Sequence, residues 1–279
     1  MNWQRLLLCC LLLLATPLQA AGYRVEKGLL YTPPDWPQSL QGDLYLPEGA
    51  GPHPVVLLVH GGSWQRGRRG QMASIARQLA REGYAAFTVS YRLAPGHRFP
   101  APLEDLQVAL HWLRQQAPVH GLDSARIAAW GFSAGGHLVS LLATRHPEAG
   151  LRAVIAGAAP QDLRQYPESR AVQALLGVSG HDAPERYAAA SPLVHVAAGS
   201  PPFFIYHGQD DALVVPAQAE AMASALQAAG VEVELFWLPG RGHVGAALFT
   251  GRSAPAAIRF LGRHLGMPRE PVPAEAAGS

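Results

Sequence analysis

Short apolar runs and longer amphipathic stretches alternate along the chain from Tyr23 onward. This alternation predicts a mostly parallel sheet of about eight strands with helices on both faces. The apolar runs that we expect to form buried strands are residues 55–59, 84–90, 126–130, 152–156 and 203–206. Apolar residues at helical spacing predict helices at residues 72–81, 103–116, 135–144 and 217–229.

Three further stretches complete this pattern. Residues 23–31 and 42–46 alternate apolar and polar side chains, which predicts an antiparallel pair at the edge of the sheet. Residues 231–238 also have the character of a strand. Residues 160–198 lack a clear strand and fall between two predicted strands, so we expect a small lid or insertion within a single domain of residues 21–266.

Composition and charge narrow the class of protein. The chain has 279 residues, of which 49% are hydrophobic and 15% charged, as is typical of a globular protein and not of a disordered one. The net charge is +2, and the basic residues are spread along the chain without a basic stripe. We therefore expect no nucleic-acid partner.

The first 20 residues have the order of a secretory signal. Arg5 is followed by a ten-residue apolar run, and small residues then offer a cleavage site after Ala20 or Ala21. A membrane anchor would need about 20 apolar residues, twice the length of this run. We therefore predict a signal peptide at residues 1–20, a secreted or periplasmic protein, and no stable membrane insertion after cleavage. Cys9 and Cys10 both lie in this segment, so the mature protein would have no disulfide.

The other end of the chain, residues 267–279, is rich in Pro, Ala and Glu and has no apolar periodicity. Such a composition cannot bury enough apolar surface to fold alone. We expect a disordered tail there.

The sequence from Gly131 to Gly135 reads Gly-Phe-Ser-Ala-Gly and has the form of a nucleophile elbow. In α/β hydrolases this motif turns sharply between a strand and a helix, and it raises the serine hydroxyl above the sheet. A predicted strand ends at Trp130 and a predicted helix follows Ser133, so the context fits. Ser133 is the candidate nucleophile, and Phe132 beside it is a candidate for the wall of the substrate pocket.

A serine nucleophile needs a base within hydrogen-bond reach and an acid that orients the base. α/β hydrolases place them in the order serine, acid, histidine, on loops after the late strands. His243 follows residues 231–238 through a glycine-rich loop and is the candidate base. Asp210 and Asp211 both follow a predicted strand, and the motif order alone does not choose between them.

The segment from His60 to Trp64 reads His-Gly-Gly-Ser-Trp and follows a buried strand directly. A glycine-rich bend at this point supplies backbone N–H groups to an oxyanion hole. The expected donors are Gly62 and Ser63, together with Ala134 after the nucleophile. We expect His60 to stabilise the loop by hydrogen bonding and Trp64 to line the pocket.

A family resemblance extends over about residues 40–265. It is carried by these motifs together with Tyr-Arg-Leu-Ala-Pro at residues 91–95 and His-Gly-Gln-Asp-Asp at residues 207–211. The chain resembles the bacterial esterases of the α/β-hydrolase fold, close to hormone-sensitive-lipase-like and feruloyl-esterase-like carboxylesterases and to kynurenine formamidase. The resemblance implies that the acid stands four positions after His207, which selects Asp211. It also implies an architectural ion pair of Arg92 with Asp105. Ser63 replaces a glycine that is usual in the hormone-sensitive-lipase-like branch, which leaves the acyl donor open.

We predict from these residues a carboxylesterase that cleaves small acyl or aryl esters through an acyl-enzyme on Ser133. A carbohydrate-ester deacylase and an arylformamidase are the alternatives within the same site, and a serine peptidase would usually carry a further large domain. An inactive binding protein of the same fold is the non-enzyme alternative. The only expected partner is a small-molecule ester, and the sequence contains no metal-ligand motif or dinucleotide motif, so no cofactor is implied.

Overall fold

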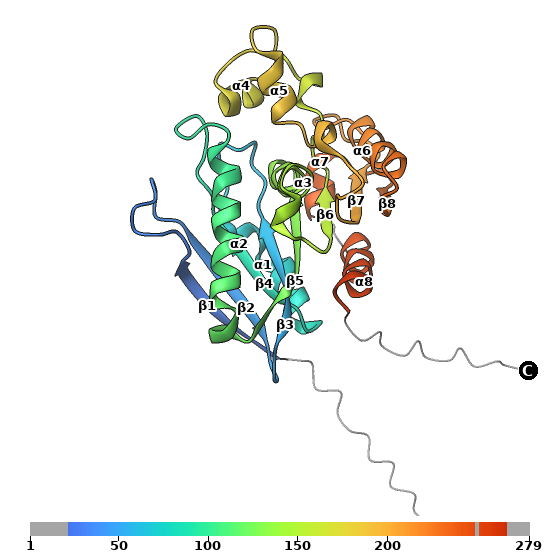
Figure 1. The fold of residues 1–279 in the computed structure, drawn as a ribbon. Helices are drawn as coiled ribbons and strands as arrows, with labels where there is room; N and C mark the ends of the chain where they lie inside the picture. The colour runs from blue at the N-terminus through green and yellow to red at the C-terminus, as the bar shows by residue number, and fades with distance from the viewer. Residues whose placement is uncertain (1–21, 249–250, 267–279) are drawn as a thin grey trace, which may run out of the picture.

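The computed structural model describes residues 22–248 and 251–266, and within them one sheet of eight strands runs through the molecule (Figure 1). The strand order is β1-β2-β4-β3-β5-β6-β7-β8. β2 pairs antiparallel with β1 and with β4, and every other neighbouring pair is parallel. The mostly parallel sheet and its antiparallel edge pair are therefore confirmed. The strands are β1 (Tyr23–Leu30), β2 (Gln41–Pro47), β3 (His53–Val59), β4 (Ala85–Val89), β5 (Leu122–Phe132), β6 (Val154–Gly157), β7 (Phe203–Gly208) and β8 (Val233–Leu238).

Helices cover both faces of the sheet because the central strands are apolar on both sides. In β3, Val55 and Leu57 belong to one buried core, whereas Val56 and Leu58 belong to the other. α2, α3 and α6 contribute to the first core, and α1 and α8 contribute to the second. The helices are α1 (Ala73–Arg81), α2 (Ala101–His120), α3 (Ala134–Arg145), α4 (Arg170–Leu176), α5 (Pro184–Ala189), α6 (Ala217–Ala228), α7 (His243–Leu248) and α8 (Ser253–Leu265).

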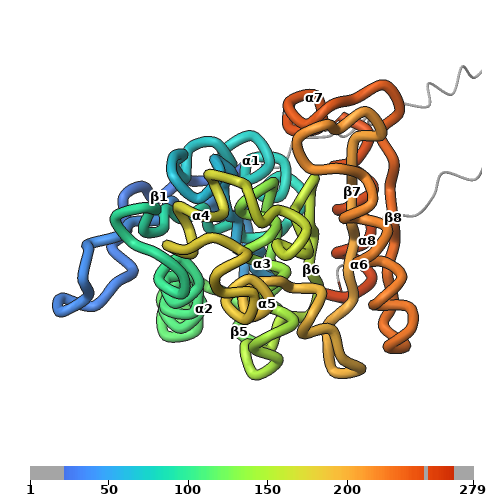
Figure 2. The backbone as a smooth tube through the Cα atoms, turned by 90° about the horizontal axis from the view of Figure 1, so that it is seen from above, coloured from blue at the N-terminus to red at the C-terminus, as the bar shows by residue number. Residues whose placement is uncertain are grey.

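The insertion predicted at residues 160–198, here called the cap, lies between β6 and β7. It contains α4, α5 and two short 3₁₀ helices, Leu163–Gln165 and Pro192–His195. In Figure 1 the cap (yellow) stands beyond one end of the sheet. Figure 2, seen from that end, shows α4 and α5 in front of the region of α3. The cap is thus placed above the end of the sheet where parallel strands of an α/β protein carry their active site.

Buried hydrogen bonds fix the base of the cap to the helices beneath it. Gln161 Nε2 donates to Ser140 Oγ of α3 at 3.2 Å. Gln218 Oε1 of α6 accepts the backbone N–H of Gln161 at 2.8 Å. Within the cap, the N–H of Leu163 donates to Ser191 Oγ at 2.9 Å. These groups are buried and paired, so their hydrogen bonds specify the position of the cap.

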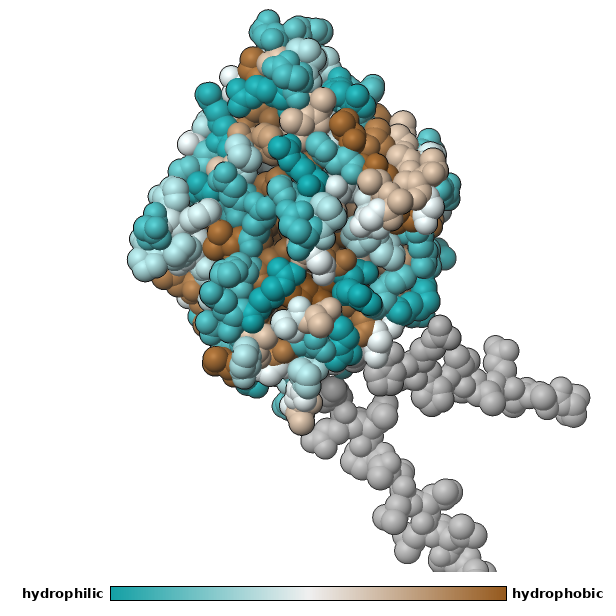
Figure 3. Space-filling model, in the orientation of Figure 1, coloured by the Kyte–Doolittle hydropathy of each residue, from teal (hydrophilic) through white to brown (hydrophobic). Residues whose placement is uncertain are grey.

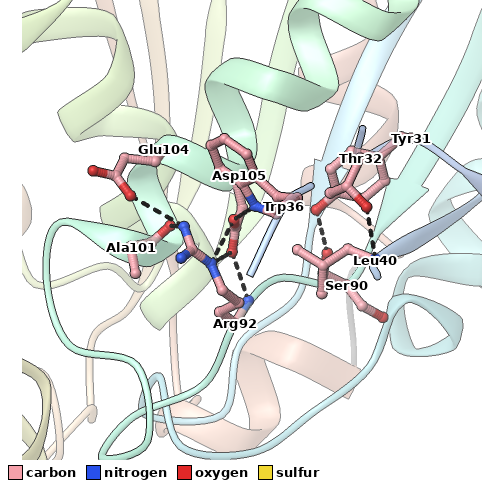
Figure 4. Close-up of polar contacts among 9 residues, drawn as sticks. All are labelled: Tyr31, Thr32, Trp36, Leu40, Ser90, Arg92, Ala101, Glu104 and Asp105. Atoms are coloured by element: carbon pink, nitrogen blue, oxygen red, sulfur yellow. Dashed lines mark hydrogen bonds and ion pairs between the residues drawn. The ribbon is translucent and has the colours of Figure 1, made fainter. Parts of the chain in front are cut away.

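Arg92, in the loop after β4, forms a buried ion pair with Asp105 of α2 (Figure 4). Arg92 Nε lies 2.8 Å from Asp105 Oδ1, and the Arg92 backbone N–H donates to Oδ2 at 2.7 Å. Trp36 Nε1 donates to the same carboxylate at 2.8 Å. Burial raises the pKa of the Asp105 carboxyl, although these hydrogen bonds oppose the shift. The ion pair that the resemblance implied is therefore confirmed.

The surface shown in Figure 3 is mostly hydrophilic, and its hydrophobic residues gather in small separate patches. Such scattered apolar residues are ordinary on a protein surface. Within residues 22–248 and 251–266, no helix combines the length and the apolar character that a membrane crossing requires. The predicted signal peptide and the predicted tail lie outside the described residues.

Candidate active site

Ser133 occupies the sharp turn between β5 and α3, with φ 53° and ψ −121°. A positive φ is strained for a residue other than glycine, and such strain persists only where the surroundings impose it. The glycines on either side make the turn possible: a Cβ at Gly131 would stand 2.2 Å from the Gly135 carbonyl oxygen, and one at Gly135 would stand 2.2 Å from that of Val59. The Gly-x-Ser-x-Gly motif is therefore a steric requirement of this turn.

The structure brings Ser133, His243 and Asp211 together in one chain of contacts. A carboxylate only accepts hydrogen bonds, so His243 Nδ1 carries a proton and donates a hydrogen bond to Asp211 Oδ2, 2.7 Å away. His243 Nε2 is then free to accept from the Ser133 hydroxyl, whose Oγ lies 2.9 Å away. Asp210 is exposed, and its backbone N–H donates to the Arg241 carbonyl. The carboxylate that contacts the histidine is thus that of Asp211.

Asp211 is 2% exposed and is held as a carboxylate by several donors. Its Oδ1 accepts the backbone N–H groups of Leu213 and Val214, each at 2.9 Å. The buried His207, on β7, lies 3.5 Å from Oδ2. Burial by itself would raise the pKa of Asp211, but the hydrogen bonds from His207, His243 and Val214 outweigh it and hold the pKa well below its usual range. The acid therefore stays ionised and fixes the orientation of His243.

The turn from His60 to Trp64 follows β3, and three of its residues have positive φ: Gly62 at 124°, Ser63 at 54° and Trp64 at 59°. A Cβ at Gly62 would stand 2.1 Å from the Arg66 carbonyl oxygen, so this position requires glycine. Ser63 and Ala134, two of the three predicted oxyanion donors, line the same pocket as Ser133. Ala134 is the first residue of α3, and the first N–H groups of a helix have no partner within the helix, so its N–H is a candidate oxyanion donor.

His60 stabilises this turn through contacts with Gly61 and Tyr91. It is fully buried, and its Nδ1 lies 2.8 Å from the Gly61 carbonyl oxygen. Its ring stacks on Tyr91 at 4.4 Å, and the Tyr91 hydroxyl donates to the His60 carbonyl at 3.0 Å. The loop-stabilising hydrogen bond expected of His60 is therefore confirmed.

A pocket of about 70 Å³ opens above Ser133. Trp64 lines it as predicted, whereas the ring of Phe132 packs against the ring of His243 at 5.2 Å and is not part of the pocket wall in the described residues. The wall also includes cap residues that sequence analysis missed. The lining residues are Ser63, Trp64, Ser133, Ala134, Pro160, Tyr166, Ser169, Ala171, Val172, Leu213 and Val214.

The chain matches the BD-FAE family model over residues 42–226, a stretch that includes Ser133 and Asp211. This chain belongs to the BD-FAE family. Among the residues that the structure describes, no group of three or more His, Cys, Asp or Glu residues is placed to hold a metal ion.

The chain is similar to curated esterases of Mycobacterium tuberculosis (strain ATCC 25618 / H37Rv). It is 32% identical to esterase LipC over 238 residues, which cover 74% of this chain and 56% of LipC. It is 30% identical to esterase LipQ over 233 residues, which cover 75% of this chain and 55% of LipQ. The chain thus spans about half the length of these relatives.

Solved structures share the fold. Esterase Est2 of the Planctomycetes species Thermogutta terrifontis matches with a TM-score of 0.73 and 25% identity, covering 90% of this chain and 96% of Est2. A truncated carbohydrate esterase from gut microbiota matches with a TM-score of 0.79 and 21% identity, covering 88% of this chain and 98% of the esterase. The predicted α/β-hydrolase fold and the resemblance to its esterases are therefore confirmed.

Proposed function

We propose that this protein is a serine carboxylesterase that forms an acyl-enzyme on Ser133. The observation that carries the proposal is the chain of contacts from Ser133 Oγ through the His243 imidazole to Asp211, at 2.9 and 2.7 Å. A serine hydroxyl is a weak nucleophile at neutral pH, and an adjacent, oriented base is the usual way to activate it. Similarity to the esterases LipC and LipQ supports the same activity.

Each group has one role in the reaction. His243 Nε2 takes the Ser133 proton as Oγ attacks the ester carbonyl carbon, and ionised Asp211 stabilises the imidazolium. Backbone N–H groups, with Ser63 and Ala134 as the donors beside the pocket, hold the developing oxyanion. The tetrahedral intermediate collapses and expels the alcohol, which receives its proton from His243. Water then attacks the acyl-enzyme with His243 again as base, and the carboxylic acid leaves.

The pocket beside Ser133 is small, with a volume of about 70 Å³. A small pocket favours short acyl groups over long ones, and we propose acyl chains of two to four carbons. Est2 has solved structures in propionate-bound and butyrate-bound forms, and it is 25% identical to this chain. That similarity supports the same range here.

Exposed apolar side chains follow both Asp211 and His243 in the sequence. Leu213, which is in the pocket wall, is 63% exposed, and Val244, directly after His243, is 67% exposed. Apolar side chains beside a catalytic site favour binding of apolar or aryl groups, since hydroxyl-rich groups would lose hydrogen bonds to water there. Simple alkyl and aryl esters are therefore favoured over sugar esters.

Hydrolysis of p-nitrophenyl esters from acetate to palmitate tests the proposal. Acetylated and feruloylated sugars and N-formylkynurenine belong in the same series, with Ser133→Ala as the control variant. We expect the highest kcat/KM for acetate to butyrate, and no turnover above background by Ser133→Ala. Preference for a sugar ester or for the formamide would replace the proposed substrate class. No turnover of any compound by the folded wild-type protein would count against the proposed activity.

We also propose export, with residues 1–20 as a cleaved signal peptide. The support is the order of cation, ten-residue apolar run and small residues in the sequence. Expression of the full chain in a bacterium with a periplasm, followed by determination of the N-terminus, tests this. A periplasmic protein that begins at Ala21 or Gly22 would support export, whereas a cytoplasmic protein that begins at Met1 would contradict it.

A further inference from the structure

His137 is fully buried one turn of α3 beyond Ser133, and it contacts two other segments of the site. Its backbone N–H donates to the Ser133 carbonyl at 2.9 Å, so its position is tied to that of the nucleophile. Its ring contacts Trp64, in the turn after β3, and Ala190, at the end of α5 in the cap. The imidazole therefore joins the three segments that surround the pocket.

The two contacts require one state of the ring. The indole N–H of Trp64 can only donate, and it lies 3.2 Å from His137 Nδ1, so Nδ1 must accept. The carbonyl oxygen of Ala190 can only accept, and it lies 2.7 Å from Nε2, so Nε2 must carry the proton. Only the neutral imidazole with its proton on Nε2 makes both bonds. Burial, which lowers the pKa of His137 to about 4, keeps the ring in this neutral state at pH 7.

The Trp64 contact bears on the site because Trp64 belongs to the strained turn that holds the expected oxyanion donors. Ser63 and Trp64 are consecutive residues with φ near 55°, a conformation that needs external support in residues with side chains. The backbone of Trp64 is held by the N–H of Ala94 at 2.9 Å. Its side chain is held by His137, through the hydrogen bond and through an edge contact of the rings at 5.1 Å.

We propose that His137 is a positioning residue. By accepting a hydrogen bond from Trp64 Nε1 at its Nδ1, it holds the turn of Ser63 and Trp64 in a fixed position relative to Ser133. This inference rests on the proposed esterase function. His137 is fully buried and is absent from the described pocket wall, so it acts through Trp64 and does not touch the substrate. Its second hydrogen bond, from Nε2 to the Ala190 carbonyl, fixes the orientation of the ring relative to the cap.

Two substitutions of His137 separate its two bonds. In His137→Asn, the side-chain oxygen takes the place of Nδ1 and can still accept from Trp64, but the donor to Ala190 is lost. In His137→Gln, the amide nitrogen reaches towards Ala190, but the acceptor for Trp64 is lost. Trp64→Phe removes the indole N–H and leaves His137 unchanged. Trp112→Phe is the matched control, because Trp112 stacks on Phe87 at 4.8 Å away from the pocket wall.

We expect kcat for p-nitrophenyl acetate to fall about 10-fold in His137→Gln and in Trp64→Phe, below the roughly 100-fold or greater loss that follows removal of an oxyanion donor itself. The double variant should be no slower than the slower single variant, because both changes break the same hydrogen bond. His137→Asn should retain most of kcat, and Trp112→Phe should retain all of it. These results distinguish a positioning role from a general loss of packing. A loss of packing would lower Tm in both His137 variants but leave kcat of the folded protein unchanged.

Wild-type kcat in folded Trp64→Phe, or losses that multiply in the double variant, would overturn the inference and leave the esterase activity standing. If His137→Gln fails to fold, Trp64→Phe is compared with His137→Asn, because Trp64 also lines the pocket. A loss of kcat in Trp64→Phe with kcat retained in His137→Asn supports the inference, and equal losses in both overturn it. Absence of Ser133-dependent turnover in the wild-type protein would overturn the proposed function, and this inference with it.

Discussion

Asp211 Oδ2 lies 2.7 Å from His243 Nδ1, whereas the carboxylate of the neighbouring residue in sequence faces solvent. Two adjacent acids therefore have different environments, and a pair of isosteric substitutions distinguishes them. Asp211→Asn removes the charge that orients the imidazole, and we expect kcat to fall roughly 10³-fold to 10⁴-fold, as in triads where the acid was replaced in this way. Asp210→Asn should change kcat less than two-fold.

Steady-state kinetics of the two variants on p-nitrophenyl acetate, with far-UV circular dichroism to verify folding, provides the measurement. Equal losses in Asp210→Asn and Asp211→Asn would contradict the assignment of Asp211. A large loss in Asp210→Asn alone would reverse it.

The Arg92–Asp105 pair leads to a prediction about stability. Asp105 is 0% exposed and is the buried partner of Arg92, whose other charged partner, Glu104 at 3.1 Å, has a side chain that is 45% exposed. Asp105→Ala leaves Arg92 with that solvent-screened partner alone and leaves Trp36 Nε1 without its acceptor. We therefore expect the free energy of unfolding to fall by about 3 kcal/mol, the lower end of the cost of breaking a buried ion pair. Since the pair does not touch the pocket, kcat at a temperature well below Tm should stay within two-fold of wild type. Urea denaturation of both proteins measures the first effect, and a loss under 1 kcal/mol would show that the pair is dispensable.

Acyl-chain preference should respond to Val172, a cap residue that lines the pocket and is 3% exposed. Val172→Ala removes two methyl groups from the wall, so we expect the ratio of kcat/KM for octanoate to that for acetate to rise by about 10-fold, the effect of roughly 1.4 kcal/mol. Val178→Ala, also in the cap but outside the pocket wall, is the matched control. An unchanged ratio in Val172→Ala would place the acyl chain elsewhere.

Stability should also depend on pH through His137. Burial lowers its pKa from 6.5 to about 4. Between these values the unfolded chain binds a proton that the folded protein does not, so the free energy of unfolding falls as the pH drops from 6.5 to 4. A shift of this size corresponds to roughly 3 kcal/mol. The lowered pKa of Asp211 acts at more acidic pH and does not contribute in this window, whereas buried His60 contributes in the same direction.

Tm measured from pH 7 to pH 4.5 tests this dependence in the wild-type protein and in His137→Gln. We expect the wild-type Tm to fall more steeply, because the variant keeps His60 but has lost His137. Parallel curves would indicate that His137 does not set this part of the pH dependence.

The elements that position the nucleophile could be predicted from the sequence because their determinants are local. Continuous apolar runs indicated β3 and β5, and the strand ends placed His60 and Ser133 at the same edge of the sheet. The turn at Ser133 requires glycine at positions 131 and 135, so the motif can be recognised in the sequence. No local determinant distinguishes Asp211 from Asp210, so the prediction of Asp211 as the acid rests on the family resemblance alone.

The pocket wall could not be predicted in the same way. Tyr166 and Val172 belong to a cap whose helices α4 and α5 have only 7 and 6 residues, too few to show a clear apolar periodicity. Their position depends on tertiary hydrogen bonds between the cap and α3, such as that of Gln161 with Ser140. Helix α8, which buries Phe260 and Leu261, was also not predicted, although its apolar residues recur at helical spacing.

The most direct test of the central claim is the site at which a fluorophosphonate reacts with the folded protein. This reagent phosphylates a serine only where a base and an oxyanion hole activate it. We predict one adduct per chain, located by peptide mass spectrometry on Ser133, and no adduct on Ser133→Ala under the same conditions. An unlabelled wild-type protein, or an adduct on another residue that persists in Ser133→Ala, would contradict the assignment of Ser133 as the nucleophile.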